Sequence, residues 1–194
     1  MKTTKPESEK ISSTELGEHS LAATAHHEAG HTVIDYRFGL DVNYVTIQPN
    51  AEKGSLGNSS SDYDRRSGTI TLEHLVQIIV SLLADYAAEC RYGTTESIAR
   101  EGAADEFERA EDWLQRAEAG KDPSTIENWI PKARQLVEEN WHAIQAIAQE
   151  LLTHETLDDA EIESIIQYAD SGDPELLEGL AKYRLHRKVG TTQA

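Results

Sequence analysis

The spacing of apolar residues predicts a chain built mainly from helices. In residues 71–92, Leu75, Ile78 and Leu82 belong to an apolar series that recurs every three or four positions. This spacing is typical of a helix with one face in a core, and Gly93 follows where such a helix would end. We expect one continuous helix over 71–92.

The same reasoning predicts five more helices. Ser20 is a suitable N-cap for the first, Gly39 is placed to end it, and Asp158 with Glu161 has the form of a capping box. The expected helices are 20–37, 103–119, a long helix that starts or kinks at Pro131 and carries Leu151, 158–168, and a last one from Asp173-Pro174.

A short stretch between the first two helices has strand character. Residues 43–48, Asn-Tyr-Val-Thr-Ile-Gln, are rich in β-forming residues, and 54–59 form a weaker second candidate strand after a turn. We therefore expect a mainly α (α+β) fold with one small β-hairpin.

Length and composition fit one globular domain. The chain has 194 residues, of which 38% are apolar, and it shows no internal repeat or interdomain linker. Residues 1–19 and 187–194 are polar, without apolar periodicity, so we expect mobile ends around a domain that spans 20–186.

Charge and cysteine content exclude several classes of protein. The 35 acidic and 18 basic residues give a net charge of −17, which disfavours binding to nucleic acid or to an anionic membrane. The longest apolar run, 75–84, is too short to span a bilayer. Because Cys90 is the one cysteine and no apolar leader follows Met1, we expect a cytoplasmic protein without an intramolecular disulfide.

The first predicted helix contains His27-Glu-Ala-Gly-His31, an HExxH sequence. A spacing of four residues places the two imidazoles one turn apart on one helix face, where they can ligate one Zn²⁺ ion. Glu28 would then act as the general base for the attacking water. In the alternative interpretation, Glu28 and His31 belong to a solvated polar face. His26 points about 100° away from His27, so we expect it to pack or to support a ligand rather than to bind the metal itself.

A third ligand has to come from elsewhere in the chain. In the predicted helix 103–119, Glu106 flanks the apolar face and Asp105 points toward water. The residues alone also allow both to be ordinary surface acids.

Several segments together resemble one family. In order, they are Thr24-Ala-His-His-Glu-Ala-Gly-His31, Val45-Thr-Ile-Gln-Pro49, Leu56-Gly57, Leu83-Ala-Asp-Tyr-Ala-Ala-Glu-Cys-Arg-Tyr-Gly93, Gly102-Ala-Ala-Asp-Glu-Phe-Glu-Arg-Ala110 and Glu150-Leu-Leu-Thr-His-Glu-Thr-Leu-Asp-Asp-Ala-Glu-Ile162. They resemble the peptidase domain of the FtsH family of ATP-dependent zinc metallopeptidases, over about 21–165.

The resemblance implies a zinc endopeptidase with His27 and His31 as ligands and Glu28 as the catalytic glutamate. The family's third ligand, an Asp, matches Glu106 here, and the neighbouring Asp105 is the alternative. Glu89 matches a family glutamate that would orient a ligand imidazole through its second ring nitrogen.

The chain also departs from the family. It has no Gly-x-x-x-x-Gly-Lys-Ser/Thr phosphate loop, so we do not expect it to hydrolyse ATP as the family's unfoldase module does. The expected substrate is an unfolded or extended polypeptide, with an ATPase or unfoldase in another chain as a possible partner. Homo-oligomerisation is left open. The alternative function is a catalytically silent adaptor that binds a protein partner.

Overall fold

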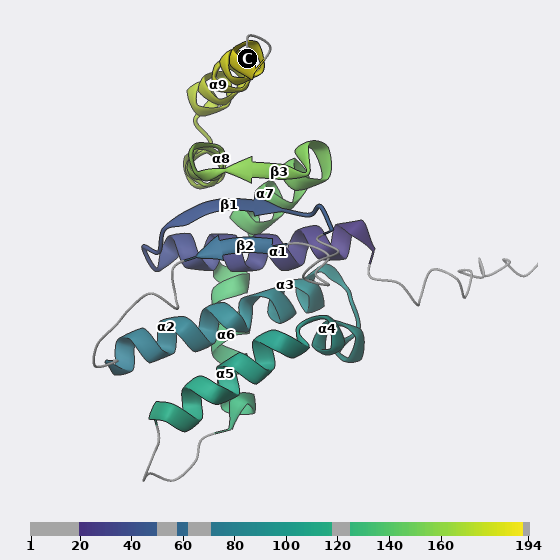
Figure 1. The fold of residues 1–194 in the computed structure, drawn as a ribbon, viewed down its shortest axis with the longest axis vertical. Helices are drawn as coiled ribbons and strands as arrows, with labels where there is room; N and C mark the ends of the chain where they lie inside the picture. Colours follow the sequence, from purple (N-terminus) through teal and green to yellow (C-terminus); the bar gives the residue numbers. More distant parts are fainter. Residues whose placement is uncertain (1–19, 50–57, 62–70, 118–124, 192–194) are drawn as a thin grey trace, which may run out of the picture.

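The structure, a computed structural model, describes residues 20–49, 58–61, 71–117 and 125–191. The described part is mainly helical with a small antiparallel sheet, as the sequence predicts (Figure 1). The elements are α1 (Leu21–Arg37), β1 (Val42–Thr46), β2 (Asn58–Ser61), α2 (Leu72–Leu82), α3 (Ala84–Tyr92), α4 (Glu96–Gly102), α5 (Ala104–Ala117), the 3₁₀ turn η2 (Ile126–Asn128), α6 (Ile130–Glu139), α7 (Trp141–His154), β3 (Thr156–Asp158), α8 (Asp159–Ser171) and α9 (Pro174–Thr191).

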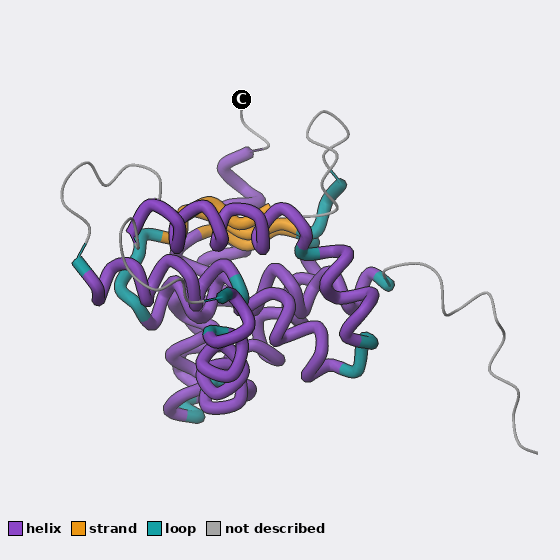
Figure 2. Tube along the Cα trace, turned by 90° about the horizontal axis from the view of Figure 1, so that it is seen from below, coloured by secondary structure: helices purple, strands orange, loops and turns teal. Residues whose placement is uncertain are grey.

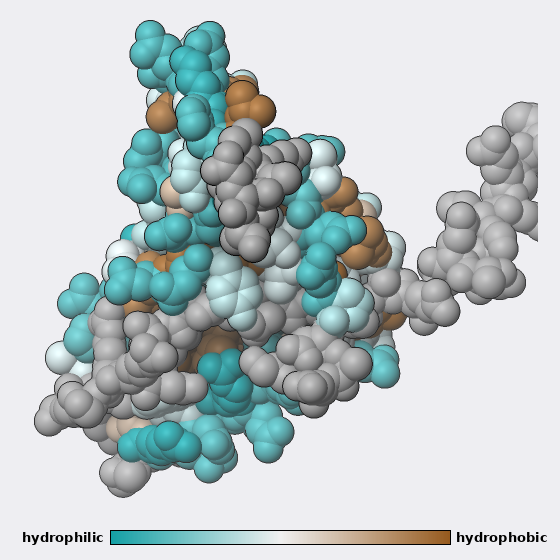
Figure 3. All heavy atoms as spheres, turned by 45° about the horizontal axis from the view of Figure 1, so that its top comes forward, coloured by the Kyte–Doolittle hydropathy of each residue, from teal (hydrophilic) through white to brown (hydrophobic). Residues whose placement is uncertain are grey.

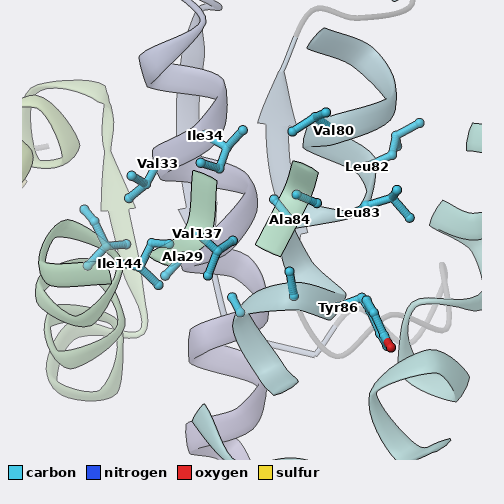
Figure 4. Close-up of a cluster of buried hydrophobic side chains, with 14 of the residues drawn as sticks. Ala29, Val33, Ile34, Val80, Leu82, Leu83, Ala84, Tyr86, Val137 and Ile144 are labelled. Carbon is cyan, nitrogen blue, oxygen red and sulfur yellow. The ribbon is translucent and has the colours of Figure 1, made fainter. Parts of the chain in front are cut away.

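Helix α1 runs through the centre of the fold. It packs most extensively against α3 on one side and α7 on the other. Figure 4 shows Ala29 and Val33 of α1 lying toward Ile144 of α7, with the α2–α3 segment across the helix. The side chains of Ala29, Val33 and Ile144 are fully buried. A helix enclosed in this way can bring polar side chains into the interior, which matters for the site below.

The predicted ends of α1 are confirmed. The Ser20 side chain accepts a hydrogen bond from the N–H of Ala23, at 3.1 Å, so it is the N-cap. After Phe38, Gly39 takes a φ of +67°, a left-handed conformation that glycine adopts without strain. The capping box that opens α8 is also confirmed, with Asp158 and Glu161 each bonded to the other's backbone N–H.

The sheet has one strand more than the predicted hairpin. Its order is β2-β1-β3, with both pairs antiparallel and β1 in the middle. The second predicted strand, 54–59, agrees with β2 only at 58 and 59, and 54–57 lie outside the described residues. Strand β3 was not predicted, because three residues are too few for an alternation of apolar and polar positions to appear. In Figure 2 the strands lie together at one side of the helices.

Two predicted helices are each divided in two. The helix expected over 71–92 breaks at Leu83, and the long helix after Pro131 breaks at Asn140. At the second break, the Asn140 side chain donates to the Leu136 carbonyl at 2.9 Å and accepts from Arg37 Nε at 2.7 Å. These are contacts of the folded chain, so apolar periodicity does not reveal them.

Helices α4, α5 and α9 also differ from the sequence prediction. The short α4 was not predicted, and α5 begins at Ala104. Helix α9 continues to Thr191, although residues from 187 on were expected to form a mobile end. Arg184 of α9 forms salt bridges at 2.7 Å with Glu150 of α7 and Glu161 of α8. The predicted N-terminal segment 1–19 lies outside the described residues.

Most of the described surface seen in Figure 3 is hydrophilic, with apolar residues in smaller patches. None of the helices in the described ranges combines the length and apolar character that a membrane crossing requires.

Candidate metal centre

The HExxH residues lie inside the protein. Glu28 is 5% exposed and His31 is 8% exposed, and Asp35, one turn further along α1, is fully buried. The alternative that these residues form a solvated polar face is therefore wrong. Buried polar side chains need partners, because an unpaired one costs free energy of about 1–3 kcal/mol.

Each imidazole is held through its Nδ1 atom. His27 Nδ1 lies 2.8 Å from Glu89 Oε1, and His31 Nδ1 lies 2.9 Å from the Ser81 carbonyl oxygen. Since a carbonyl oxygen only accepts, His31 donates from Nδ1, and its neutral ring keeps a lone pair at Nε2. The Glu89 carboxylate favours the same arrangement in His27. In both rings Nε2 is thus the atom that could ligate a metal ion.

The two Nε2 atoms face a carboxylate that the sequence did not single out. His27 Nε2 lies 3.4 Å and His31 Nε2 lies 3.6 Å from Oδ2 of Asp85, which is fully buried at the start of α3. Among the described residues, Asp85 Oδ2 has no hydrogen-bond partner. Ligand atoms at about 2.0–2.1 Å from a tetrahedral metal ion lie about 3.3 Å apart. These separations are therefore close to those of ligand atoms around a shared ion.

A second carboxylate completes the group. Ligand atoms of His27, His31, Asp85 and Glu106 all lie within 4.8 Å of one another, and this group can hold a metal ion. Of the two candidates on α5, half-buried Glu106 joins the group, and Asp105 is exposed. The structure thus brings together His27, His31 and Glu106 as the sequence predicts, and adds Asp85.

The local electrostatics attract a positive charge. Burial disfavours a charged His27, but the charge of Asp85, the hydrogen bond that His27 donates to Glu89 and the charge of Glu28 outweigh it and raise the pKa of His27 to about 10. Burial, and then the positive charge of His27, lowers the pKa of His31 to about 3. A cation bound among these groups would replace the His27 proton and satisfy the same carboxylates.

Asp85 and Glu28 also have shifted pKa values, because both are buried next to other charged groups. Burial raises the pKa of Asp85 well above its usual value, and neighbouring Glu106 adds to the shift. Burial also raises the pKa of Glu28 to about 7, with a lowering effect from His27 and a raising effect from Glu106. A carboxyl group with a pKa near neutrality can both accept and release a proton at neutral pH.

Gly30, inside the HExxH sequence, allows α1 to approach α3. A Cβ atom at this position would lie 2.7 Å from the Ala84 carbonyl oxygen and 2.8 Å from the Ala88 Cβ. Because Asp85 and Glu89 lie on α3, this close approach is what places them beside the imidazoles of α1.

The break between α2 and α3 serves the site as well. The Ser81 carbonyl, one residue before the end of α2, accepts from His31, and the Ser81 hydroxyl donates to the buried carboxylate of Asp35. Sequence reasoning missed Ser81 and Asp85. The available signal was an aspartate in a segment of otherwise apolar residues, 82–88, where an unpaired acid is costly.

His26 has the packing role that the sequence predicts. Its Nδ1 bonds to the Ala22 carbonyl at 2.7 Å, and its ring stacks on Tyr92 and Trp141 with centroids 4.1 and 5.5 Å away. It lies outside the group of residues that can hold a metal ion.

No protein-family model matches the chain, and no curated protein matches it either.

Proposed function

We propose that this protein is a zinc metallopeptidase that hydrolyses peptide bonds of unfolded or extended polypeptides. One observation carries the proposal. The histidines of an HExxH sequence are each fixed at Nδ1 and direct Nε2 into a buried group of carboxylates, next to the buried Glu28. The ordered resemblance to the FtsH peptidase domain supports the same activity.

The choice of zinc follows from the donor set. Two imidazole nitrogens with carboxylate oxygens are ligands that Zn²⁺ accepts in hydrolytic sites, and the hydrogen bond that His27 donates to Glu89 is the kind of support that such ligands receive. The Oδ2 atom of Asp85 makes no hydrogen bond among the described residues and lies near Nε2 of both histidines, so it also fits a cation. In this proposal His27, His31 and Glu106 hold the ion.

Zinc, when bound, polarises the substrate carbonyl and lowers the pKa of a nearby water to about 7. Glu28 takes the proton from that water as it attacks the carbonyl carbon, and then gives the proton to the leaving amine. Glu89 and the Ser81 carbonyl keep the two imidazoles in one orientation throughout. The buried position of Glu28 excludes bulk water that would compete for the proton.

The expected range of substrates is limited, because the sequence lacks a motif for ATP-driven unfolding. The 194 residues contain no phosphate loop, so to act on folded proteins this domain would need an ATPase or unfoldase working beside it. On its own it would cut segments that are already extended. No metabolite, nucleic acid or lipid is needed as a substrate in this proposal.

A catalytically silent adaptor is the second candidate. The observation that favours it is the fourth ligand atom at the site, because metal sites closed by four protein ligands are typical of structural zinc. Such a protein would keep the metal and use its acidic surface to bind a partner.

We expect the purified chain, supplied with zinc, to cleave an unfolded protein such as a reduced and alkylated polypeptide. A chelator should abolish cleavage, and zinc should restore it, because the ion is required for the reaction. Gel electrophoresis and mass spectrometry of the products measure the result. Metal-bound protein without any cleavage would favour the adaptor. A protein that binds no metal would contradict both the zinc peptidase and an adaptor that keeps zinc.

A further inference from the structure

We propose that Asp85 is a fourth protein ligand whose carboxylate occupies the position that the attacking water needs. The resting centre is then closed, and it opens to water or to a substrate only when Asp85 moves away from the ion. This inference rests on the proposed metal centre and concerns its regulation.

The position of Asp85 Oδ2 is the first argument. It lies nearly equidistant from the two ligating nitrogens, at 3.4 Å from His27 and 3.6 Å from His31. Hydrogen bonds between such groups are shorter, at about 2.7–3.2 Å. The separations match those of atoms that share a metal ion and exceed those of direct hydrogen bonds.

The chemical environment of Asp85 is the second argument. The side chain is fully buried, and among the described residues no hydrogen-bond donor reaches its Oδ2 atom. A carboxylate oxygen in that state costs free energy unless a cation pairs with it. In the metal-free chain the cation available to it is a protonated His27, 3.4 Å away, and an ion held by the two histidines would take that place.

The backbone fixes Asp85 in this direction. Its Oδ1 atom accepts a hydrogen bond from the N–H of Tyr86, at 2.5 Å, in the first turn of α3. The neighbouring Ala84 carbonyl lies against Gly30, so this end of α3 is held next to the HExxH turn of α1. Asp85 is thus positioned by packing, and its Oδ2 atom is left to face the ion.

The consequence is a change in coordination. Catalytic zinc sites have three protein ligands and an open position, whereas four protein ligands close the site. With His27, His31, Glu106 and Asp85 all bound, a water molecule has no position next to Glu28. Release of Asp85 would convert the closed centre into the open, hydrolytic one.

Cobalt(II) provides the test, because its visible absorption reports both the number of ligands and the entry of a new one. The protein is loaded with Co²⁺ and titrated with acetohydroxamate, a small chelating anion, before and after Asp85→Ala. We expect the unaltered protein to keep its spectrum at concentrations of acetohydroxamate that change the spectrum of the variant. The Kd for Co²⁺ should rise about tenfold or more in Asp85→Ala, since a ligand is lost.

Two further variants make the result specific. Asp105→Ala removes an exposed acid on α5 and should behave as the unaltered protein. Asp85→Asn keeps the side-chain volume and the acceptor for Tyr86, so it reports on the lost charge if Asp85→Ala does not fold. An equal response of the unaltered protein and of the Asp85 variants, with equal Kd, would overturn the inference and leave the metal centre standing. Failure of the unaltered protein to bind Co²⁺ would overturn the proposed centre and this inference together.

Discussion

Glu28→Gln is expected to keep the metal ion and to reduce peptide cleavage by about 10²–10⁴-fold, the range for loss of a general acid–base group. Glutamine has nearly the same shape, but its amide cannot take a proton from the attacking water. His27 and His31 keep their hydrogen bonds to Glu89 and Ser81, so the metal ligands are unchanged. The measurement is the initial rate of cleavage of an unfolded protein, together with metal content.

A matched control is Glu101→Gln, which makes the same chemical change at an exposed position of α4. It should leave both rate and metal content as they are. If Glu28→Gln cleaves as fast as the unaltered protein, Glu28 is not the base, and the mechanism proposed above is wrong even if zinc is bound.

Gly30→Ala is expected to weaken the metal site and the fold together. The added methyl group would lie 2.7 Å from the Ala84 carbonyl oxygen, a backbone atom that cannot turn aside, so α1 and α3 have to separate. Overpacking of this kind costs about 1–3 kcal/mol, which exceeds the gain of up to about 1 kcal/mol from the better helix propensity of alanine. Asp85 and Glu89 move with α3, so metal affinity falls as well.

Thermal unfolding of the metal-free protein and a zinc competition titration measure the two effects. Gly179→Ala on α9 is the control, because a Cβ there meets no atom within 4 Å and only helix propensity changes. We expect Gly179→Ala to be neutral or slightly stabilising. Unfolding and affinity of Gly30→Ala equal to those of this control would show that the α1–α3 approach does not define the site.

The parts of the fold that the sequence predicts are those governed by local chemistry. The N-cap Ser20, the turn at Gly39 and the capping box of Asp158 and Glu161 depend on residues a few positions apart, and all three are present. The breaks at Leu83 and Asn140 depend on partners far along the chain, such as Arg37 for Asn140. Apolar spacing continues through both breaks, so it predicted longer helices.

The residues of the candidate site also fall into those that the sequence predicts and those that depend on contacts between helices. Helical geometry was enough to place Glu106 toward the interior and Asp105 toward water, and the structure agrees. The hydrogen bond between Glu89 and His27, which the family resemblance implied, is also present. Asp85 was missed because its importance comes from the approach of α3 to α1, which a helical wheel of either element cannot show.

The most direct test of the metal centre is the metal content of the untagged, purified protein, measured by elemental mass spectrometry after zinc is supplied and excess is removed. Glu106→Ala and Asp105→Ala are prepared in the same way. We predict about one zinc ion per chain in the unaltered protein and in Asp105→Ala, and a marked loss in Glu106→Ala. A chain that retains no zinc, or one whose zinc content is the same in all three proteins, would contradict the centre described here.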